Sequence, residues 1–239
     1  MSELAVKLTK LGKYFGPITA LGSVDLSLQP GEFLTVFGPN GSGKTTLMRI
    51  IATLARPSSG SVSLFGKDVR RALAPVRRRI GLVTHQSLLY SSLSGFQNVL
   101  FFARMFGVDD APDRAREILA KMGLEYRMDD ALSTYSRGME QRCAIARALV
   151  HRPDVLLLDE PFSGLDPDAA ARLHDLLANP EGGSRTVILT THDLTRGAEL
   201  ADRVAILARG HLVFDTPVEQ IAVGAMPDIY REHTRGGQE

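Results

Sequence analysis

The sequence contains little cysteine, no long apolar run and almost no net charge. Cys143 is the only cysteine among the 239 residues, which excludes an internal disulfide framework and a cysteine cluster for a metal. No stretch approaches the roughly 18 apolar residues that span a bilayer, and the alternating residues 1–10 lack the apolar core of a signal peptide. If the protein works at a membrane, we therefore expect another chain to supply the membrane-spanning part.

Opposite charges nearly cancel, since 28 Lys and Arg face 27 Asp and Glu for a formal net charge of +1. This balance argues against a protein that coats nucleic acid, and we expect no nucleic-acid partner. A local basic cluster nevertheless occurs, at Arg70, Arg71, Arg77, Arg78 and Arg79. This cluster could face lipid headgroups or nucleic acid, or it could be an ordinary solvated and ion-paired surface. The neutral overall charge balance favours the last interpretation.

The spacing of apolar residues divides the chain into three parts. Short alternating or wholly apolar runs, typical of strands, occupy the first and last thirds with helical patterns between them. From residue 94 to about 150 the spacing is helical only, which indicates a helical insertion. We predict an α/β fold with a mostly parallel sheet. The strands are expected near residues 4–8, 24–28, 33–37, 61–65, 80–83, 155–158, 187–190, 204–207 and 212–214.

Three helices are predicted in the two outer parts. One follows a glycine-rich loop, from about 44 to 54. A second begins with Asp166 as N-cap and Pro167 at its first position, because proline fits where no backbone N–H is needed. A third, late helix is expected to open at residues 216–219, whose Thr-Pro-Val-Glu sequence resembles a capping box.

The most specific motif lies between the predicted strand 33–37 and the helix that follows it. It matches the pattern G-x-x-x-x-G-K-[ST], whose glycines let backbone N–H groups curl around phosphate while the helix N-terminus adds partial positive charge. We expect Lys44 to reach the β- and γ-phosphates of a nucleotide and the Thr45 hydroxyl to ligate Mg²⁺. The expected nucleotide-binding residues are Gly38, Pro39, Asn40, Gly41, Ser42, Gly43, Lys44, Thr45 and Thr46.

Two adjacent acids end the apolar run 155–158. Ligands of open parallel sheets bind at the carboxyl ends of the strands, where Asp159 is therefore expected to hold Mg²⁺, through a water. Glu160 follows and can orient or deprotonate an attacking water. Phosphoryl transfer to water needs a clamp, a metal and a positioned nucleophile, so the sequence predicts nucleotide hydrolysis.

With these motifs in place, the sequence resembles the ATP-binding cassette (ABC) ATPases over essentially its whole length. Residues 135–142, Tyr-Ser-Arg-Gly-Met-Glu-Gln-Arg, look like the family signature, and residues 163–166, Ser-Gly-Leu-Asp, look like the D-loop. Gln86 looks like the Q-loop glutamine, which touches Mg²⁺ and couples to the membrane partner. His192 resembles the switch histidine near the γ-phosphate, and Phe15, with Tyr14 as an alternative, fits the aromatic that stacks on adenine.

The signature departs from the common Leu-Ser-Gly-Gly-Gln form of the family. Ser136 and Gly138 are kept, whereas Arg137 and Met139 replace a glycine and a glutamine. Ser136 and the start of the next helix can still offer a hydroxyl, N–H groups and a helix dipole to a phosphate. Arg137 either adds positive charge to that contact or points into solvent.

The resemblance implies a fold and a division of the chain. The fold is that of a P-loop (RecA-like) core with a mostly parallel sheet, an antiparallel β subdomain and a helical subdomain. The whole chain, 1–239, is then one ATPase domain. Approximately residues 1–88 and 151–239 form the core with the β subdomain, and residues 89–150 form the helical subdomain with the signature.

The resemblance also implies partners and cofactors. The cofactors are ATP and Mg²⁺, with Glu160, His192 and Lys44 in catalysis. The signature of one copy, including Ser136 and Gly138, and the D-loop Asp166 complete the phosphate site of a second copy or a paralogous cassette, head to tail. A separate integral membrane permease is driven by hydrolysis, which places the chain in the cytoplasm on the inner face of the membrane.

The motifs describe ATP chemistry and leave the cargo open. Residues 85–90, together with the Tyr-Ser-Arg-Gly-Met signature, look like exporter cassettes, most similar to the haem-exporter ATPases of bacterial cytochrome c maturation. An ABC-2-type exporter of drugs, lipids or polysaccharides is the alternative. A non-transport ABC ATPase acting on ribosomes or DNA is disfavoured, because the insertion is short and lacks sustained heptads.

Two weaker features have competing interpretations. The apolar residues 99–102 with Met105 and Phe106 are either core or, as the family implies, part of a groove for a helix of the membrane partner. Four histidines without ligand spacing are expected at the surface: His151, His174, His211 and His233.

Overall fold

The computed structural model describes residues 3–71, 73–181 and 183–234, and its larger sheet has six strands. The spatial order β10-β9-β3-β8-β7-β6 is parallel except for β10, which runs antiparallel to β9. This confirms the predicted α/β class with a mostly parallel sheet. The strands are β3 (Phe33–Phe37), β6 (Ile80–Val83), β7 (Val155–Asp159), β8 (Thr186–Thr190), β9 (Arg203–Ala208) and β10 (His211–Pro217).

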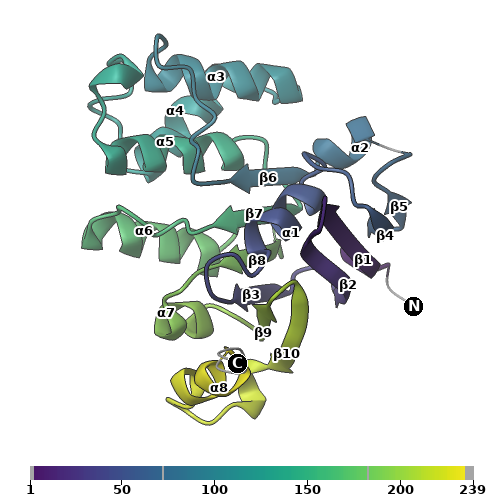
Figure 1. Cartoon of the computed structure of the whole chain (residues 1–239). Helices are drawn as coiled ribbons and strands as arrows, with labels where there is room; N and C mark the ends of the chain where they lie inside the picture. The colour runs from purple at the N-terminus through teal and green to yellow at the C-terminus, as the bar shows by residue number, and fades with distance from the viewer. Residues whose placement is uncertain (1–2, 72, 182, 235–239) are drawn as a thin grey trace.

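The smaller sheet is antiparallel, with the order β2-β1-β4-β5, and lies to the right in Figure 1. Its strands are β1 (Val6–Phe15), β2 (Ile18–Leu28), β4 (Ser59–Leu64) and β5 (Lys67–Asp68). The hairpin β1–β2 is much longer than residues 4–8 and 24–28 suggest. Register shifts beyond Leu8 and Leu11 interrupt the alternation of apolar and polar side chains, so the pattern hides the outer half of both strands.

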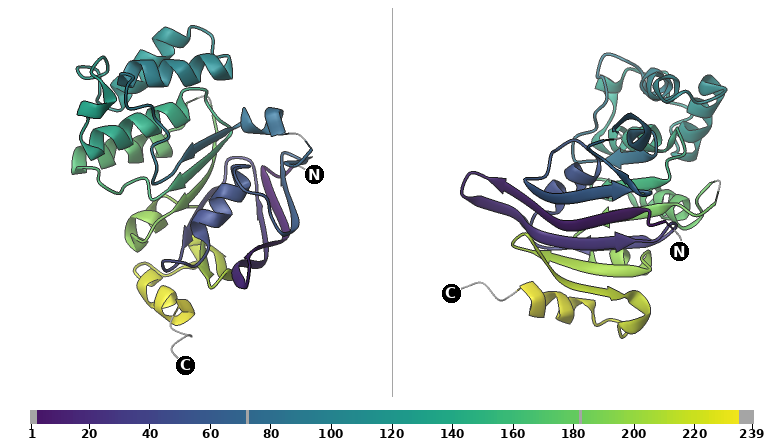
Figure 2. Two further views of the ribbon diagram at one scale, coloured as in Figure 1. Left: turned by 45° about the horizontal axis from the view of Figure 1, so that its top comes forward. Right: turned by 90° about the vertical axis from the view of Figure 1, so that its right-hand side faces the viewer.

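Helices α3 (Gly95–Phe106), α4 (Ala111–Lys121) and α5 (Arg137–Leu149) form a helical layer at the top of Figure 1. The helical spacing of residues 94–150 is therefore confirmed. Helix α3 starts with a full capping box, in which Ser94 accepts from the Gln97 N–H and the Gln97 side chain accepts from the Ser94 N–H. Both views in Figure 2 show this layer and α8 (Met226–Thr234) at opposite ends of the molecule.

The remaining helices are α1 (Lys44–Ile51), α2 (Leu73–Arg77), α6 (Pro167–Ala178) and α7 (Leu194–Glu199). The predicted start of α6 is confirmed, since the Asp166 carboxylate accepts the Ala169 N–H at 2.8 Å. Helix α1 ends three residues earlier than predicted, because Thr53 adopts the left-handed conformation with φ 62°.

The late helix predicted at residues 216–219 is wrong. Strand β10 continues to Pro217, with Thr216 paired to Val204, so the ladder holds Thr216 extended and it cannot cap a helix. Only a three-residue 3₁₀ helix, Val218–Gln220, follows, without a side-chain cap, and α8 begins later.

The central strands are buried on both faces. Every residue of β3, β7 and β8 is buried, which explains their continuous apolar sequence. One apolar cluster lies between the antiparallel sheet, α1 and the six-stranded sheet, and a second joins that sheet to α3–α6. Within the described residues, no helix combines the length and the apolar character needed to cross a membrane.

His151, which was expected at the surface, is only partly exposed and makes specific contacts. Its ring stacks on Phe106 with the centroids 3.9 Å apart, and its Nε2 lies 3.0 Å from the Ile80 carbonyl oxygen. Burial lowers the pKa of His151 to about 4, so the ring is neutral. The contacts of His151 could not be predicted from the sequence, because the residues around the ring come from three separate segments.

Candidate functional site

The predicted phosphate loop, residues 38–43, joins β3 to α1 at the carboxyl end of the parallel sheet. Strands β7 and β8 end beside it, at Asp159 and Thr190. In parallel sheets this edge is where ligands bind. A cavity of about 260 Å³ lies here, lined by residues 40–46 of the loop and α1, by Asp159 and Glu160, and by residues 18–20 of β2.

Two glycines of the loop have no room for a side chain. A Cβ on Gly38 would lie 2.2 Å from the Leu207 carbonyl oxygen. A Cβ on Gly43, whose φ is 108°, would lie 2.4 Å from the Ala20 carbonyl oxygen. At these two positions the loop therefore packs directly against the backbone of β9 and β2, where only glycine fits.

Lys44 is buried at the first position of α1, with 9 % of its surface exposed. Its Nζ donates to the Gly38 carbonyl oxygen at 2.6 Å and the Pro39 carbonyl oxygen at 3.1 Å, so the side chain curls back over the loop. Burial lowers the pKa of Lys44, while the nearby Asp159 and Glu160 carboxylates oppose that shift. A positive charge is thus held beside two negative charges at the cavity.

The Asp159 carboxylate joins three elements. Its Oδ2 accepts from the Thr45 hydroxyl at 2.9 Å, and its Oδ1 accepts from the Thr190 hydroxyl at 2.5 Å. The sequence reasoning placed Thr45 and Asp159 together but missed Thr190. A signal did exist, because Thr190 is a polar residue at the end of an apolar parallel strand, paired in register with Asp159.

Glu160 and His192 form the second polar pair. His192 Nδ1 lies 2.9 Å from Glu160 Oε1, and the imidazole is 80 % exposed. Glu160 has φ 52°, a left-handed conformation that is rare for glutamate, and its N–H donates to the Thr190 carbonyl oxygen. The turn after β7 thus aims the carboxylate at the cavity, which Glu160 lines.

Other predicted residues lie outside this cavity. Gln86 is exposed, and its backbone N–H and carbonyl oxygen are both bound to the Thr84 hydroxyl. Phe15 is 53 % exposed at the end of β1, paired with Ile18, which does line the cavity. Tyr14, the alternative aromatic, is comparably exposed on the same strand.

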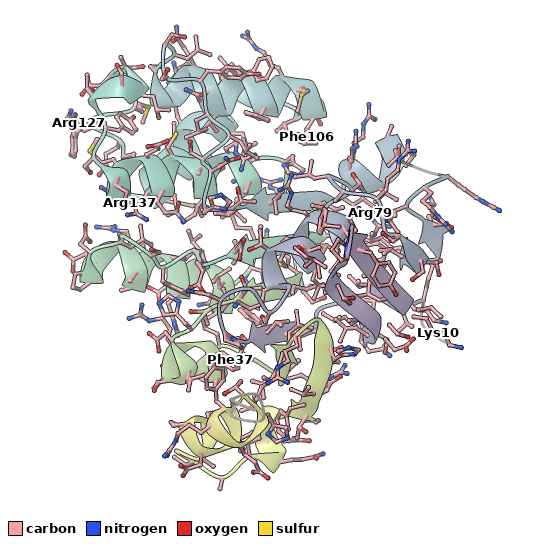
Figure 3. All side chains as sticks on the ribbon, in the orientation of Figure 1. Lys10, Phe37, Arg79, Phe106, Arg127 and Arg137 are labelled. Atoms are coloured by element: carbon pink, nitrogen blue, oxygen red, sulfur yellow. The ribbon has the colours of Figure 1, made fainter. Side chains whose placement is uncertain are left out.

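The predicted signature begins α5, where the Ser136 hydroxyl accepts the Met139 N–H as an N-cap. Gly138 packs on the predicted D-loop, since a Cβ there would lie 3.0 Å from the Gly164 carbonyl oxygen. Arg137, labelled at the start of α5 in Figure 3, is exposed and also lies against Gly164. A second cavity of about 340 Å³ joins these segments and includes Arg137, Ser163 and Glu160.

The donors at the first cavity fit Mg²⁺ and a nucleotide triphosphate. Thr45 and Asp159 offer two oxygen ligands, the type that Mg²⁺ prefers. In the part of the chain that the structure describes, no group of three or more His, Cys, Asp or Glu could hold a metal ion. Mg²⁺ commonly binds through one or two protein oxygens together with phosphate and water, and these two donors fit that pattern.

Fold and site together define a P-loop nucleoside triphosphatase. The family model described as ABC transporter matches residues 21–163, which is more than half of the chain and includes the phosphate loop, the signature and both acids. The chain belongs to the ABC transporter family and is an ATP-hydrolysing cassette.

Several relatives are ATP-binding proteins named for drug resistance or for export. The chain is 37 % identical to the daunorubicin resistance ATP-binding protein DrrA3 of Streptomyces coeruleorubidus, over 92 % of this chain and 71 % of that protein. It is 34 % identical to the Nod factor export ATP-binding protein I of Paraburkholderia xenovorans, over 89 % of this chain and 71 % of that protein. The chain thus spans about seven tenths of the length of both relatives.

Solved cassettes share the whole architecture. A dimeric structure of the ATP-binding cassette MJ0796, in a post-hydrolysis state bound to ADP and Pi, superposes with a TM-score of 0.83 at 30 % identity. The match covers 89 % of this chain and 98 % of that chain. The predicted P-loop core with its helical and antiparallel parts is therefore confirmed.

Proposed function

We propose that two copies of this chain close head to tail around two Mg-ATP and drive a separate membrane permease that exports an amphiphilic small molecule. The observation that carries the proposal is the meeting of two polar pairs, Thr45 with Asp159 and Glu160 with His192, at the phosphate loop. Each pair joins segments more than 30 residues apart in the chain. The chain acts at the inner face of the membrane, bound to its permease.

In the proposed reaction ATP is the substrate and water the nucleophile. Lys44 and the backbone N–H groups of residues 40–46 bind and orient the phosphates. Glu160 accepts a proton from the water as its oxygen bonds to the γ-phosphorus, and the bond to the ADP oxygen breaks. His192 holds the Glu160 carboxylate and contacts the γ-phosphate. Thr45, Asp159 and Gln86 would hold Mg²⁺, which when bound would neutralise charge on the phosphate oxygens.

The second copy completes each site in this proposal. Ser136 and Gly138 present a hydroxyl and N–H groups at the start of α5, and they lie outside the cavity of their own chain. The dimer of the MJ0796 cassette supports this arrangement. Asp166 caps α6 and so fixes the D-loop beside the signature, while Phe15 stacks on adenine.

The cargo assignment rests on the relatives. The haem exporters and the ABC-2-type exporters share the motifs of this chain, but relatives named for daunorubicin resistance and Nod factor export favour the second group. We therefore propose a drug-like or lipid-like amphiphile as cargo. Affinity capture of the chain from detergent-solubilised membranes tests the exporter assignment. We expect it to recover a multi-span permease. Haem absorbance with cytochrome-maturation proteins in the eluate would return the assignment to haem export.

The test of the ATP sandwich is the variant Glu160→Gln. Removing the proton acceptor is expected to slow phosphate release roughly 10²- to 10⁴-fold. ATP binding is retained because the phosphate loop is unchanged, so the variant should accumulate as a dimer in Mg-ATP by light scattering. Glu199→Gln, an exposed carboxylate on α7, is the matched control and should hydrolyse ATP normally. A Glu160→Gln chain that stays monomeric at saturating Mg-ATP would refute the sandwich.

A further inference from the structure

The basic cluster noted in the sequence forms a surface that the ATPase cycle does not use. Residues 67–79 hold six of the chain's 28 basic residues and one of its 27 acidic residues. The rest of the chain therefore carries 22 basic and 26 acidic side chains, a negative balance. The near-neutral total thus conceals a strongly positive segment, which includes β5 and α2 and ends just before β6. Figure 3 shows nitrogen-tipped side chains gathered around α2.

The arginines of this segment divide into neutralised and free groups. Arg79 pairs with Asp154 at 2.6 Å, and Arg78 faces a cavity that also contains Asp109, Asp110 and Asp113. Arg70 pairs with Asp68 at 2.9 Å. Arg71 makes no ion pair among the described residues, and neither does Arg56, which belongs to the neighbouring turn. The ion-paired interpretation of the cluster therefore holds for some members only.

A hollow of about 340 Å³ lies beside three arginines of this region. Arg56, Arg70 and Arg77 line it, and no acidic side chain does. Arg77 is held in place, because its Nε donates to the Thr53 hydroxyl at 2.7 Å and its Nη2 to the Thr53 carbonyl oxygen at 3.2 Å. The left-handed turn at Thr53 presents these two acceptors side by side. We define the α2 basic surface as Arg56, Arg70, Arg71 and Arg77, with the exposed Leu54 and Leu73.

We propose that the α2 basic surface binds the phosphate headgroups of anionic phospholipids. Guanidinium groups match phosphate in charge and geometry, and clusters of about four or more basic residues attract anionic membranes. Two leucines, 52 % and 41 % exposed, stand among the arginines, which suits the border between headgroups and acyl chains better than it suits nucleic acid. The surface also adjoins a small hollow that Arg77 shares with Phe102 and Phe106, next to the apolar face of α3.

This inference rests on the proposed function, because that function places the chain at a membrane. The binding of phosphate headgroups by the arginines itself requires neither ATP nor a permease. The surface orients the cassette against the bilayer with α2 and the C-terminal end of α3 on the same side. It also raises the local concentration of the cassette near its permease, because membrane attachment confines the search to the bilayer surface.

The test is flotation of the full-length chain with vesicles, without nucleotide. One vesicle preparation is phosphatidylcholine alone, and the other contains about 30 mol % phosphatidylglycerol. We expect binding to the anionic vesicles only, and its loss at about 0.5 M NaCl, where exposed charges are screened. The variant Arg56→Gln/Arg71→Gln removes two guanidinium groups that make no hydrogen bond or ion pair in the described structure, so the fold is unaffected. Its vesicle partition coefficient should fall about tenfold or more.

The matched control is Arg127→Gln/Arg172→Gln, which removes the same charge far from α2; Arg127 is labelled at the opposite side of Figure 3. It should bind vesicles like the unchanged chain. Equal loss in both double variants would mean unspecific attraction and would overturn the proposal. Equal binding to both vesicle types would also overturn the proposal. The same holds if the cassette binds acidic loops of a permease and does not bind vesicles. Phosphate release, measured in parallel, should be unaltered in both double variants, which separates this proposal from the ATPase mechanism.

Discussion

The phosphate loop and the helical layer α3–α5 differ in where their polar and apolar side chains lie. At the loop, Lys44 and Asp159 are 9 % and 4 % exposed and are held by several hydrogen bonds. On α3 the situation is reversed, because Phe101 and Met105 are 44 % and 53 % exposed. Chemistry on phosphate needs fixed charges in a shielded place, whereas contact with another protein needs apolar side chains that remain available.

The phosphate loop and the helical layer are also held together by different interactions. The loop depends on glycine conformations and backbone contacts, and the helical layer depends on apolar burial by residues such as Ile118 and Leu119. Changes at the loop should therefore affect activity, and changes inside the helical layer should affect folding. Each of the following variants tests that distinction.

The largest effect is expected for Lys44→Ala. The variant removes the buried cation at the cavity, so phosphate release should fall by about 10²- to 10³-fold in kcat/KM, the effect of losing one electrostatic contact to a transition state. A malachite-green phosphate assay measures it. Lys7→Ala, an exposed lysine on β1, is the control and should retain activity. Unchanged turnover in Lys44→Ala would disprove the assignment of this loop to phosphate.

The second effect is in the helical layer. Leu119→Ala removes a fully buried side chain and should lower the free energy of unfolding by about 2–5 kcal/mol. Met105→Ala, on the exposed side of the same layer, should change it by about 0.5 kcal/mol or less. Urea unfolding followed by circular dichroism measures both. If the two variants were equally unstable, the exposed side of α3 would be part of the core after all.

A third comparison lies within the phosphate loop. Gly43→Ala forces a Cβ towards the Ala20 carbonyl oxygen, so the loop must shift, at a cost of about 1–3 kcal/mol. Gly41 has φ 78°, but a Cβ there would meet open space. Gly41→Ala should therefore cost only the backbone strain, about 1–2 kcal/mol. Thermal unfolding ranks the two. Nucleotide affinity should fall more in Gly43→Ala, and a reversed ranking would contradict the backbone packing described above.

The smallest effect concerns an ion-pair network on α4. Hydrogen bonds from Lys121 and Arg114 lower the pKa of Glu117 to about 2, from an ordinary value of 4.5. Since the folded pKa is the lower one, the stabilisation is present above pH 4.5 and disappears as the pH falls towards 2. The Glu117 side chain is 44 % exposed, so Glu117→Gln should cost about 1 kcal/mol or less at pH 7.

Denaturant unfolding at pH 7 and near pH 3 checks this last expectation. The difference between the unchanged chain and Glu117→Gln should shrink at the lower pH. Glu125→Gln is the control, because Glu125 is exposed and makes no ion pair among the described residues, and it should show no such trend. A difference that grew on acidification would mean that the pairing is not electrostatic.

The α/β class, the helical insertion and the position of the phosphate loop could all be predicted from the amino-acid sequence. These follow from local causes, since apolar period, capping residues and a glycine pattern act over a few neighbours. The same locality explains why Asp166 was identified as an N-cap, while the proposed capping box at Thr216 was not realised. There a partner strand held the backbone extended, and no local pattern could show it.

Which distant side chains meet depends on how the strands and helices pack together. Thr190 reaches Asp159 because two parallel strands end in register, and His151 is partly buried because its ring stacks on Phe106. This packing also divides the arginines of one basic run into ion-paired and free members, according to whether an acidic side chain from another segment lies near. Hydrogen bonds and burial between remote segments depend on how the sheets and helices pack, and that packing is a property of the whole chain.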